Sequence, residues 1–249
     1  MSIPLWRENH YDLTGRVALV AGAWGVLGQA VSAALLGSGA RVIALSGHSQ
    51  PDDEQRLRAQ VGDASARLTT LDADARDEAA VSGAVAEVAR QAGRLDALVN
   101  LIGGYEAGRP VAELEAATFE RMLELNLRPT FLLSKYAARE MARQQWGRIV
   151  NISSRAAHSG RRNAAAYAIA KMGVITLTEA QAEETRDANI TVNAVLPSII
   201  DTPTNRRAMP KAAFDRWPRP EQIARVIAFL LSDDAALISG ASIPVYGLA

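Results

Sequence analysis

Short apolar runs alternate with longer segments of helical periodicity along almost the whole 249-residue chain. Runs such as "RVALVAG" (16–22) and "ITVNAVLP" (190–197) are mostly apolar at consecutive positions, without the polar alternation of a strand that has one face in water. Strands of this kind are typical of parallel sheets covered on both faces. Seven strands are expected, at residues 16–22, 40–47, 67–74, 95–104, 147–154, 190–197 and 241–247.

The segments between these strands have helical periodicity. They cover residues 26–39, 51–62, 77–93, 116–145 and 163–185. Strand–helix repetition with right-handed crossovers predicts an α/β fold, a doubly wound, Rossmann-type, mostly parallel seven-stranded sheet with helices on both faces. We expect a single domain over residues 1–249, because the chain contains no linker, low-complexity tract or repeat. The irregular segment at about 199–219 is expected to form a short lid.

The composition excludes several classes of function. Lys plus Arg (27) balances Asp plus Glu (27), so no global charge favours nucleic acid or an acidic membrane as partner. There is no cysteine, and the three histidines are scattered, so we expect no metal site. No run approaches the ~18 apolar residues of a membrane span. The start of the sequence lacks the apolar core of a signal peptide, and a cytoplasmic protein is expected.

The first expected strand leads into a glycine-rich turn, "AGAWGVLG" (21–28), which opens a helix. Glycines in such a turn let the backbone approach a pyrophosphate, which the N–H groups and dipole of the helix N-terminus then hold. The alternative is an ordinary strand-to-helix turn in which glycine supplies a positive φ. Its place in the first βαβ unit favours the dinucleotide site.

A second motif, "YAIAK" (167–171), places Tyr167 and Lys171 on one face of a helix. Ser154 lies thirteen residues before Tyr167, at the carboxyl end of a strand, where open α/β sheets bind ligands. A free phenol has a pKa of about 10, so a neighbouring positive charge is needed to favour the phenolate. Lys171 is expected to supply that charge.

These motifs resemble the short-chain dehydrogenase/reductase family over nearly the whole chain. The family's first turn reads T-G-x-x-x-G-x-G; Gly22 and Gly28 match it, Ala21 replaces the threonine, and Val26 stands at the middle glycine beside Gly25. The resemblance implies an NAD(P)-dependent oxidoreductase that interconverts a carbonyl and a secondary alcohol of a small molecule. It also implies a homotetramer or a dimer, assembled through the helices at 116–145 and 163–185.

The resemblance implies four catalytic residues. Tyr167 exchanges a proton with the substrate oxygen, Ser154 hydrogen-bonds the same oxygen, and Lys171 holds the nicotinamide ribose. Ser153 is the rival serine, but its side chain should point to the other side of the strand. Asn126 matches the helix asparagine whose carbonyl holds a water beside the lysine. Pro129 lacks an N–H for the Leu125 carbonyl, so a local distortion of the helix is expected there.

The resemblance also implies a cofactor site. Asp74 stands where the family has an aspartate that contacts the adenine of the cofactor. The alternative is an acidic residue that caps or begins a helix, and Asp77 fits that role. In "NLIG" (100–103), Asn100 either braces the sheet or contacts the ligand. "LPSIIDTPTNR" (196–206) resembles the family's P-G-x-x-x-T segment, with Ser198 in place of the glycine. The expected site comprises Gly22, Gly25, Val26, Leu27, Gly28, Ser46, His48, Asp74, Ala75, Asn100, Gly103, Tyr167, Lys171, Pro197, Ile199 and Thr202.

The choice between the two nicotinamide cofactors depends on the end of the second strand. A carboxylate there usually binds the ribose hydroxyls of NAD, but this position holds Ser46, followed by Gly47 and His48. No acid repels the 2′-phosphate of NADP, and no arginine stands in the glycine turn or just after Ser46 to bind it. The sequence favours NADP over NAD by a small margin, with His48 as the phosphate contact.

The substrate side gives weaker signals. Arg155, His158, Arg161 and Arg162 lie in one loop, which either selects an acidic or phosphopantetheine-linked substrate or is simply exposed. Tyr105 is expected at the mouth of the same site. A further group either lines an apolar pocket under the lid or belongs to the core; it consists of Met209, Phe214 and Trp217.

Two other functions stay open at this point. A non-catalytic sensor that binds a dinucleotide is compatible with Val26 and the missing ribose signal, although Ser154, Tyr167 and Lys171 argue against it. A dehydratase or epimerase would use the same residues without net consumption of cofactor. An enoyl reductase fits less well, because that relative spaces its tyrosine and lysine more widely.

Overall fold

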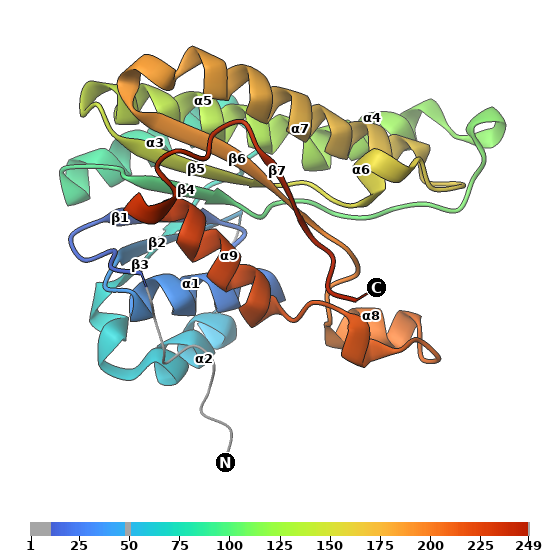
Figure 1. Cartoon of the computed structure of the whole chain (residues 1–249), viewed down its shortest axis with the longest axis horizontal. Helices are drawn as coiled ribbons and strands as arrows, with labels where there is room; N and C mark the ends of the chain where they lie inside the picture. Colours follow the sequence, from blue (N-terminus) through green and yellow to red (C-terminus); the bar gives the residue numbers. More distant parts are fainter. Residues whose placement is uncertain (1–10, 48–50, 249) are drawn as a thin grey trace.

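The structure is a computed structural model that describes residues 11–47 and 51–248. It contains a parallel sheet whose strands follow the order β3-β2-β1-β4-β5-β6-β7 (Figure 1). The strands are β1 (Val17–Ala21), β2 (Arg41–Ser46), β3 (Leu68–Asp72), β4 (Ala97–Asn100), β5 (Gly147–Ile152), β6 (Ile190–Pro197) and β7 (Ser242–Val245). Every neighbouring pair is parallel, which confirms the expected doubly wound α/β fold.

Helices cover both faces of the sheet. They are α1 (Val26–Gly37), α2 (Pro51–Val61), α3 (Glu78–Ala92), α4 (Ala116–Asn126), α5 (Arg128–Arg143), α6 (Ala156–Ser159), α7 (Ala165–Glu184), α8 (Pro203–Ala208) and α9 (Pro220–Leu231). Figure 1 shows α1 and α9 on one side of the sheet and α3, α5 and α7 on the other. Within residues 11–47 and 51–248, no helix has the length and apolar character needed to cross a membrane.

The alternation of side chains along β1 shows why the strand is apolar throughout. Val17, Leu19 and Ala21 point into the core under α3 and α5, whereas Ala18 and Val20 point into the core under α1 and α9. All five are buried, because successive side chains of a strand face opposite sides of the sheet and helices cover both. The continuous apolar run in the sequence follows from this two-sided burial.

The helix expected at 116–145 is two helices. α4 ends at Asn126 and α5 begins at Arg128, with Leu127 between them at φ −97° and ψ −46°. Pro129 causes the change, since it has no N–H for the Leu125 carbonyl and its ring crowds that turn. The distortion expected from the sequence is therefore present, and it lies next to Asn126.

The helix α9, which packs against α1 on one face of the sheet, was not among the predicted helices. Its signals are Pro220 at the first helical position and buried apolar residues at helical spacing, among them Ile223, Ile227 and Leu230. The segment at 199–219, expected to be irregular, contains α8 and a 3₁₀ turn at Phe214–Arg216.

We predict that Gly28→Ala destabilises the protein whereas Gly83→Ala stabilises it. A Cβ at Gly28 would lie 2.2 Å from the carbonyl oxygen of Gly22, so α1 must move away from the turn that precedes it. At Gly83 in α3 a Cβ would meet nothing within 4 Å. We expect losses of about 1–3 kcal/mol for the first variant and gains of about 0.5–1 kcal/mol for the second. Urea unfolding measures both, and a shift in the same direction would contradict the close packing of α1.

Candidate active site

The register of the parallel strands brings the expected site residues to one edge of the sheet. Ala21 at the end of β1 pairs with Asn100 of β4, and Asn100 pairs with Asn151 of β5. The next residues of each strand therefore leave the sheet side by side. The glycine turn follows β1, and Ser154 follows β5. This is the carboxyl edge at which open α/β sheets bind their ligands.

Tyr167 lies in the first turns of α7 and makes a side-chain hydrogen bond with Ser154. The Ser154 hydroxyl also accepts a hydrogen bond from the backbone N–H of Ala156 at 3.2 Å. Tyr105 presents its ring edge-on to Tyr167, with the centroids 4.9 Å apart at 83°. Burial raises the pKa of Tyr167, the bond with Ser154 opposes that rise, and Tyr105 adds to it. The phenol is thus held as a proton donor.

Lys171 lies one turn further along α7 and is only 4% exposed. Its ammonium donates a hydrogen bond to the Ile152 carbonyl at 3.0 Å and lies 5.9 Å from the centroid of the Tyr167 ring. Burial lowers the pKa of Lys171 to about 8, since a charge is costly away from water. Burial thus shifts the two pKa values in opposite directions, upward for Tyr167 and downward for Lys171.

The two serines after β5 point in different directions, as the alternation along a strand predicts. Ser153 is buried and donates a hydrogen bond to the carbonyl of Lys171 at 2.7 Å. Ser154 faces Tyr167 and the cleft described below. Ser153 therefore anchors α7 to the sheet, and its neighbour is the serine available to a substrate.

Asn126 is fully buried at the end of α4. Its side-chain amide donates to the Met122 carbonyl at 3.0 Å, and its Oδ1 accepts from the N–H of Gly104 at 3.1 Å. Its backbone carbonyl accepts the hydroxyl of Thr130 at 2.9 Å. The side chain thus ties the break between α4 and α5 to the loop after β4.

Gly103 is required because Asn126 and Lys171 both approach it closely. A Cβ at Gly103 would lie 2.6 Å from Asn126 Oδ1 and 3.0 Å from Lys171 Nζ. The loop after β4 can therefore lie this close to the two polar groups only if Gly103 carries no side chain. The match at Gly103 has a steric reason that the sequence motif alone does not give.

The start of α1 fits a diphosphate. Gly22 has φ +80°, which favours glycine, and Gly25 is an N-cap without a side-chain hydrogen bond. The first turn of α1 contains no acidic residue, which suits the binding of an anion by its N–H groups and dipole. Val26, the departure from the glycine pattern, is 48% exposed, and Leu27 is half-buried behind it.

Asn100 also fits a polar ligand at this edge. Its Oδ1 accepts a hydrogen bond from the Ile102 N–H at 3.3 Å, while its buried Nδ2 has no hydrogen-bond partner among the described residues. A buried amide nitrogen without a partner is costly unless a ligand or water accepts its hydrogen bond. The Oδ1 of Asn100 therefore stabilises the loop after β4, and its Nδ2 is available to a ligand.

The remaining expected cofactor residues lie at the same edge or near it. Asp74 forms an ion pair with Arg76 at 2.7 Å, which lowers its pKa to about 2, and Asp77 is the residue that caps α3. Ala75 is buried between them, and Ser46 ends β2. Pro197 ends β6, Ile199 lines the cleft, and Thr202 caps α8. His48 lies outside the described residues.

A cleft of about 420 Å³ opens beside Tyr167 and Ser154. Its described lining residues are Tyr105, Ser154, Arg155, Ala156, Ser159, Arg161, Tyr167, Ser198, Ile199, Ile200, Asn205 and Met209. The structure places Arg155, Arg161 and Tyr105 in this lining, as the sequence suggested, and leaves His158 and Arg162 out of it. Sequence reasoning missed Ser159, Ser198 as a lining residue, and Asn205, since nothing in their local pattern indicates which way a loop side chain faces.

The three apolar residues of the expected lid do not all share one role, since some line the cleft and others belong to the core. Met209 lines the cleft, whereas Trp217 is buried. Phe214 packs against Trp217 with the ring centroids 5.0 Å apart. Of these three residues, Met209 is therefore the one that lines the cleft.

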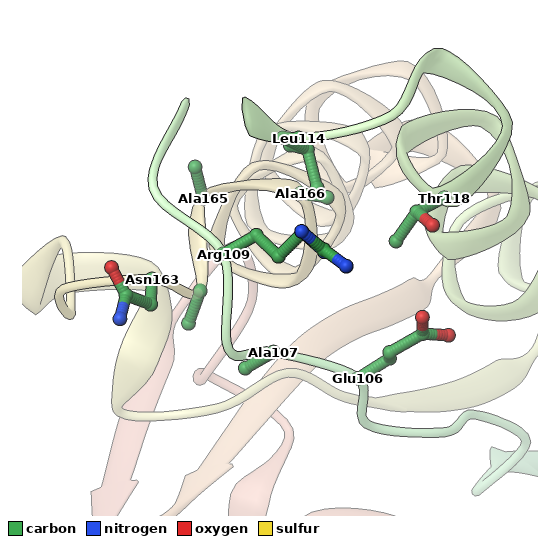
Figure 2. Close-up of a pocket in the computed structure, with 9 residues that line it drawn as sticks. Glu106, Ala107, Arg109, Leu114, Thr118, Asn163, Ala165 and Ala166 are labelled. Carbon is green, nitrogen blue, oxygen red and sulfur yellow. The ribbon is translucent and has the colours of Figure 1, made fainter. Parts of the chain in front are cut away.

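A second, smaller cavity of about 120 Å³ lies between the segment that precedes α4 and the start of α7. Figure 2 shows Arg109 extending across it, with Glu106 and Thr118 beyond the guanidinium and Asn163 on the opposite side. Tyr167 and Ser154 do not line it, so it is distinct from the candidate active site.

Comparison with known proteins agrees with this geometry. The family model described as short chain dehydrogenase matches residues 16–213. A cis-4-hydroxycyclohexanecarboxylate dehydrogenase of Sinomonas cyclohexanicum is 36% identical over 93% of this chain and 95% of its own. Among solved structures, carveol dehydrogenase from Mycobacterium avium in complex with NAD has a TM-score of 0.86 at 28% identity, covering 95% of this chain and 98% of its own. ElxO with NADP bound has a TM-score of 0.86 at 27% identity, covering 93% and 97%.

The chain therefore belongs to the short-chain dehydrogenase family. It is an NAD(P)-dependent oxidoreductase that interconverts a carbonyl group and an alcohol.

We predict that the burial of Lys171 makes the stability of the cofactor-free protein depend on pH. The pKa of Lys171 is lowered from 10.5 to about 8, so the folded protein releases this proton before the unfolded chain does as the pH rises. The free energy of unfolding of the wild type should then rise relative to Lys171→Met by about 2 kcal/mol between pH 8 and pH 10. Urea unfolding across this range measures the difference, with the exposed Lys211→Met as control. An equal pH dependence in the three proteins would contradict it.

Proposed function

We propose that Tyr167 exchanges a proton with the substrate oxygen in the hydride-transfer reaction, while Ser154 holds that oxygen. The observation that carries the proposal is the hydrogen bond between the Tyr167 and Ser154 side chains, made at the wall of the cleft. Both hydroxyls reach the same space, so one carbonyl oxygen can accept a hydrogen bond from each. The bound nicotinamide supplies or accepts the hydride.

In the reduction direction, the Tyr167 hydroxyl donates its proton to the substrate oxygen as the carbonyl carbon is reduced to an alcohol. Because burial raises the pKa of Tyr167, the phenol holds this proton at neutral pH until the oxygen becomes basic. Ser154 donates a hydrogen bond to the same oxygen and stabilises its developing negative charge. In the oxidation direction the phenolate takes the proton of the alcohol.

Lys171 and Asn126 then restore the proton on Tyr167. The Lys171 ammonium, buried beside the phenol, favours the phenolate once the proton has left. Its pKa of about 8 lies close enough to neutral pH for the lysine to pass a proton on. The Asn126 side chain approaches Gly103 on the same side as this ammonium. A carbonyl at the helix break, such as that of Leu125, which Pro129 leaves without its helical donor, would hold a relay water.

A non-catalytic sensor and a dehydratase or epimerase have no support among the relatives. Relatives such as D-threitol dehydrogenase of Mycolicibacterium smegmatis and levodione reductase of Leifsonia aquatica are named for oxidation of alcohols or reduction of carbonyls. The geometry of Ser154, Tyr167 and Lys171 serves that chemistry.

We predict that Tyr167→Phe lowers kcat by about 10²–10⁴-fold while the affinity for the nicotinamide cofactor changes little. Phenylalanine keeps the ring packed against Tyr105 but removes the proton that the substrate oxygen requires. Steady-state kinetics with a secondary alcohol, together with cofactor titration, separates the two effects. Tyr11→Phe serves as control, since Tyr11 packs against Phe229 away from the cleft. Unchanged turnover in Tyr167→Phe would show that another group transfers the proton.

We propose that the cofactor is held between the start of α1 and the loop after β4. The N–H groups of Val26 and Leu27 face the diphosphate, and the unpartnered Nδ2 of Asn100 donates to the ligand. Asp74 stays ionised through its ion pair with Arg76 and accepts a hydrogen bond from the adenine amine. Ser46 at the end of β2 leaves room for a 2′-phosphate, and this favours NADP over NAD.

We predict that the purified protein binds NADPH more tightly than NADH, by about tenfold, because no carboxylate follows β2 to bind the ribose hydroxyls. Titration with the two reduced cofactors, followed by nicotinamide fluorescence, measures this difference. His48→Ala should then weaken NADPH and leave NADH unchanged. Tighter binding of NADH would reverse the assigned preference, and binding of neither would show that Val26 blocks the turn.

We also propose a homo-oligomer formed through α5 and α7, a tetramer or a dimer. Large apolar side chains are exposed on these two helices, namely Phe131, Ile169 and Met172. Covering such a surface is favourable in water, and a second copy of the chain would do so symmetrically. Sedimentation velocity at micromolar concentration tests this proposal, and a monomer would contradict it. The segment at 199–219, which carries Met209, is proposed to act as the lid of the cleft.

A further inference from the structure

The proposed lid at 199–219 is held at its first end by a side chain in which this chain departs from the family's motif. Ser198 stands where the P-G-x-x-x-T pattern has a glycine, and its hydroxyl donates a hydrogen bond to the backbone carbonyl of Tyr246 at 2.7 Å. A glycine at this position would have no hydroxyl to donate. The start of the lid is therefore tied, by a group particular to this sequence, to the segment that follows β7.

The second end of the lid is tied to the same segment, residues 246–248, which we call the tail. The N–H of Leu248 donates a hydrogen bond to the carbonyl of Arg216 at 2.9 Å, and in Figure 1 the chain after β7 runs toward α8. Gly247 has φ +64°, and a Cβ there would lie 2.6 Å from the carbonyl oxygen of Arg216 and 3.0 Å from the nitrogen of Pro218. The tail can therefore lie this close to the lid only with a glycine at position 247.

The tail is itself fixed to the body of the protein through Tyr246. The Tyr246 ring packs against a buried apolar cluster that consists of Ala157, Ile175, Ala194 and Leu196. The guanidinium of Arg155, which directly follows Ser154, lies over the same ring, 5.1 Å from its centroid. The hydrogen bonds from the tail therefore hold the lid against a part of the structure that is packed in place.

The lid is connected internally from one end to the other. The N–H of Asp201 donates to the carbonyl of Pro218 at 3.0 Å, which joins the two ends. The Asp201 carboxylate forms an ion pair with Arg206 at 2.6 Å, and the Arg206 guanidinium lies 5.0 Å from the centroid of the Phe214 ring. The position of the lid therefore depends on what holds its two ends.

The lid contributes part of the cleft wall, and the tail does not. The lining residues that come from the lid are Ile199, Ile200, Asn205 and Met209. Among the described residues, the lining includes none of the tail. A change in the tail can therefore reach a substrate only by moving the lid.

We propose that Ser198, Gly247 and Leu248 are positioning residues that fasten both ends of the lid to the tail and set how far the lid opens from the cleft. This inference rests on the proposed function, which assigns residues 199–219 as the lid. The lid moves away from the cleft as the hydrogen bonds of Ser198 and Leu248 break, so these bonds set the fraction of molecules in which it is open. Substrate affinity then depends on residues outside the cleft.

The test is hydrogen–deuterium exchange of the purified full-length protein, in which peptides from the lid are compared with peptides from β1 and β5. Leu248→Pro removes the N–H that the Arg216 carbonyl accepts. The matched control Leu248→Ala keeps this N–H and shortens a side chain that is 72% exposed. We expect exchange in the lid to be about three- to tenfold faster in Leu248→Pro and in Ser198→Ala, as the loss of one hydrogen bond gives. Gly247→Ala should have at least this effect, and Leu248→Ala should exchange like the wild type.

Steady-state kinetics with a secondary alcohol at saturating cofactor gives the second readout. Leu248→Pro should raise KM by a similar factor, about three- to tenfold, while kcat changes by less than about twofold. The reason is that Ser154 and Tyr167 stay in place and only the lid side of the cleft becomes less ordered. A general loss of folded protein would instead lower the apparent kcat and leave KM unchanged.

Unchanged lid exchange in Leu248→Pro would overturn the proposal, as would an equal increase in the peptides of β1 and β5. Equally fast lid exchange in Leu248→Ala would also overturn it, because the Leu248 side chain would then hold the lid. Faster lid exchange with an unchanged KM would refute the effect of the tail on the cleft. Failure of the proposed function is distinguishable: the wild type would then not turn over the alcohol, while exchange, measured without substrate, would still decide whether the tail holds the lid.

Discussion

The parallel pairing of all the strands is the constraint on which the rest of the structure depends. Because β1, β4, β5 and β6 run in one direction and in register, the segments that follow them emerge at one edge of the sheet. The glycine turn, Asn100, Ser154 and Pro197 are separated by tens of residues in the sequence and meet there. An antiparallel pair among these strands would send one of these segments to the opposite edge and dismantle the site.

Burial connects this architecture to the chemistry. The sheet must be covered on both faces, so α7 lies against it, and Lys171 enters the protein interior with it. Away from water its pKa falls while the pKa of Tyr167 rises, so the lysine releases its proton more readily than the phenol does. Ser153 secures α7 through the carbonyl of Lys171, and Gly103 gives the ammonium the room it needs. The same packing that stabilises the fold therefore tunes the proton donor.

Strands were easier to predict from the sequence than helices, for a physical reason. A strand buried on both faces is apolar at nearly every position, as β1 is throughout and β6 is apart from Thr191 and Asn193. The boundary between α4 and α5 at Leu127 can be inferred from the sequence, because Pro129 has no N–H for the carbonyl of Leu125. The helix α9 was not predicted, although Pro220 at its first position and its regular apolar spacing are both visible in the sequence.

The sequence by itself determined the fold class, the family, and the choice of Ser154, Tyr167 and Lys171, because these depend on local periodicity and fixed spacings along the chain. Only the tertiary structure decided which groups share a cleft and what charge state they hold. It separated Arg155 and Arg161 from Arg162, since the direction of a loop side chain is set by the elements packed around it. It also set the pKa shifts of Tyr167 and Lys171, because desolvation depends on how much protein surrounds a group in space, and distant segments of the chain provide that protein.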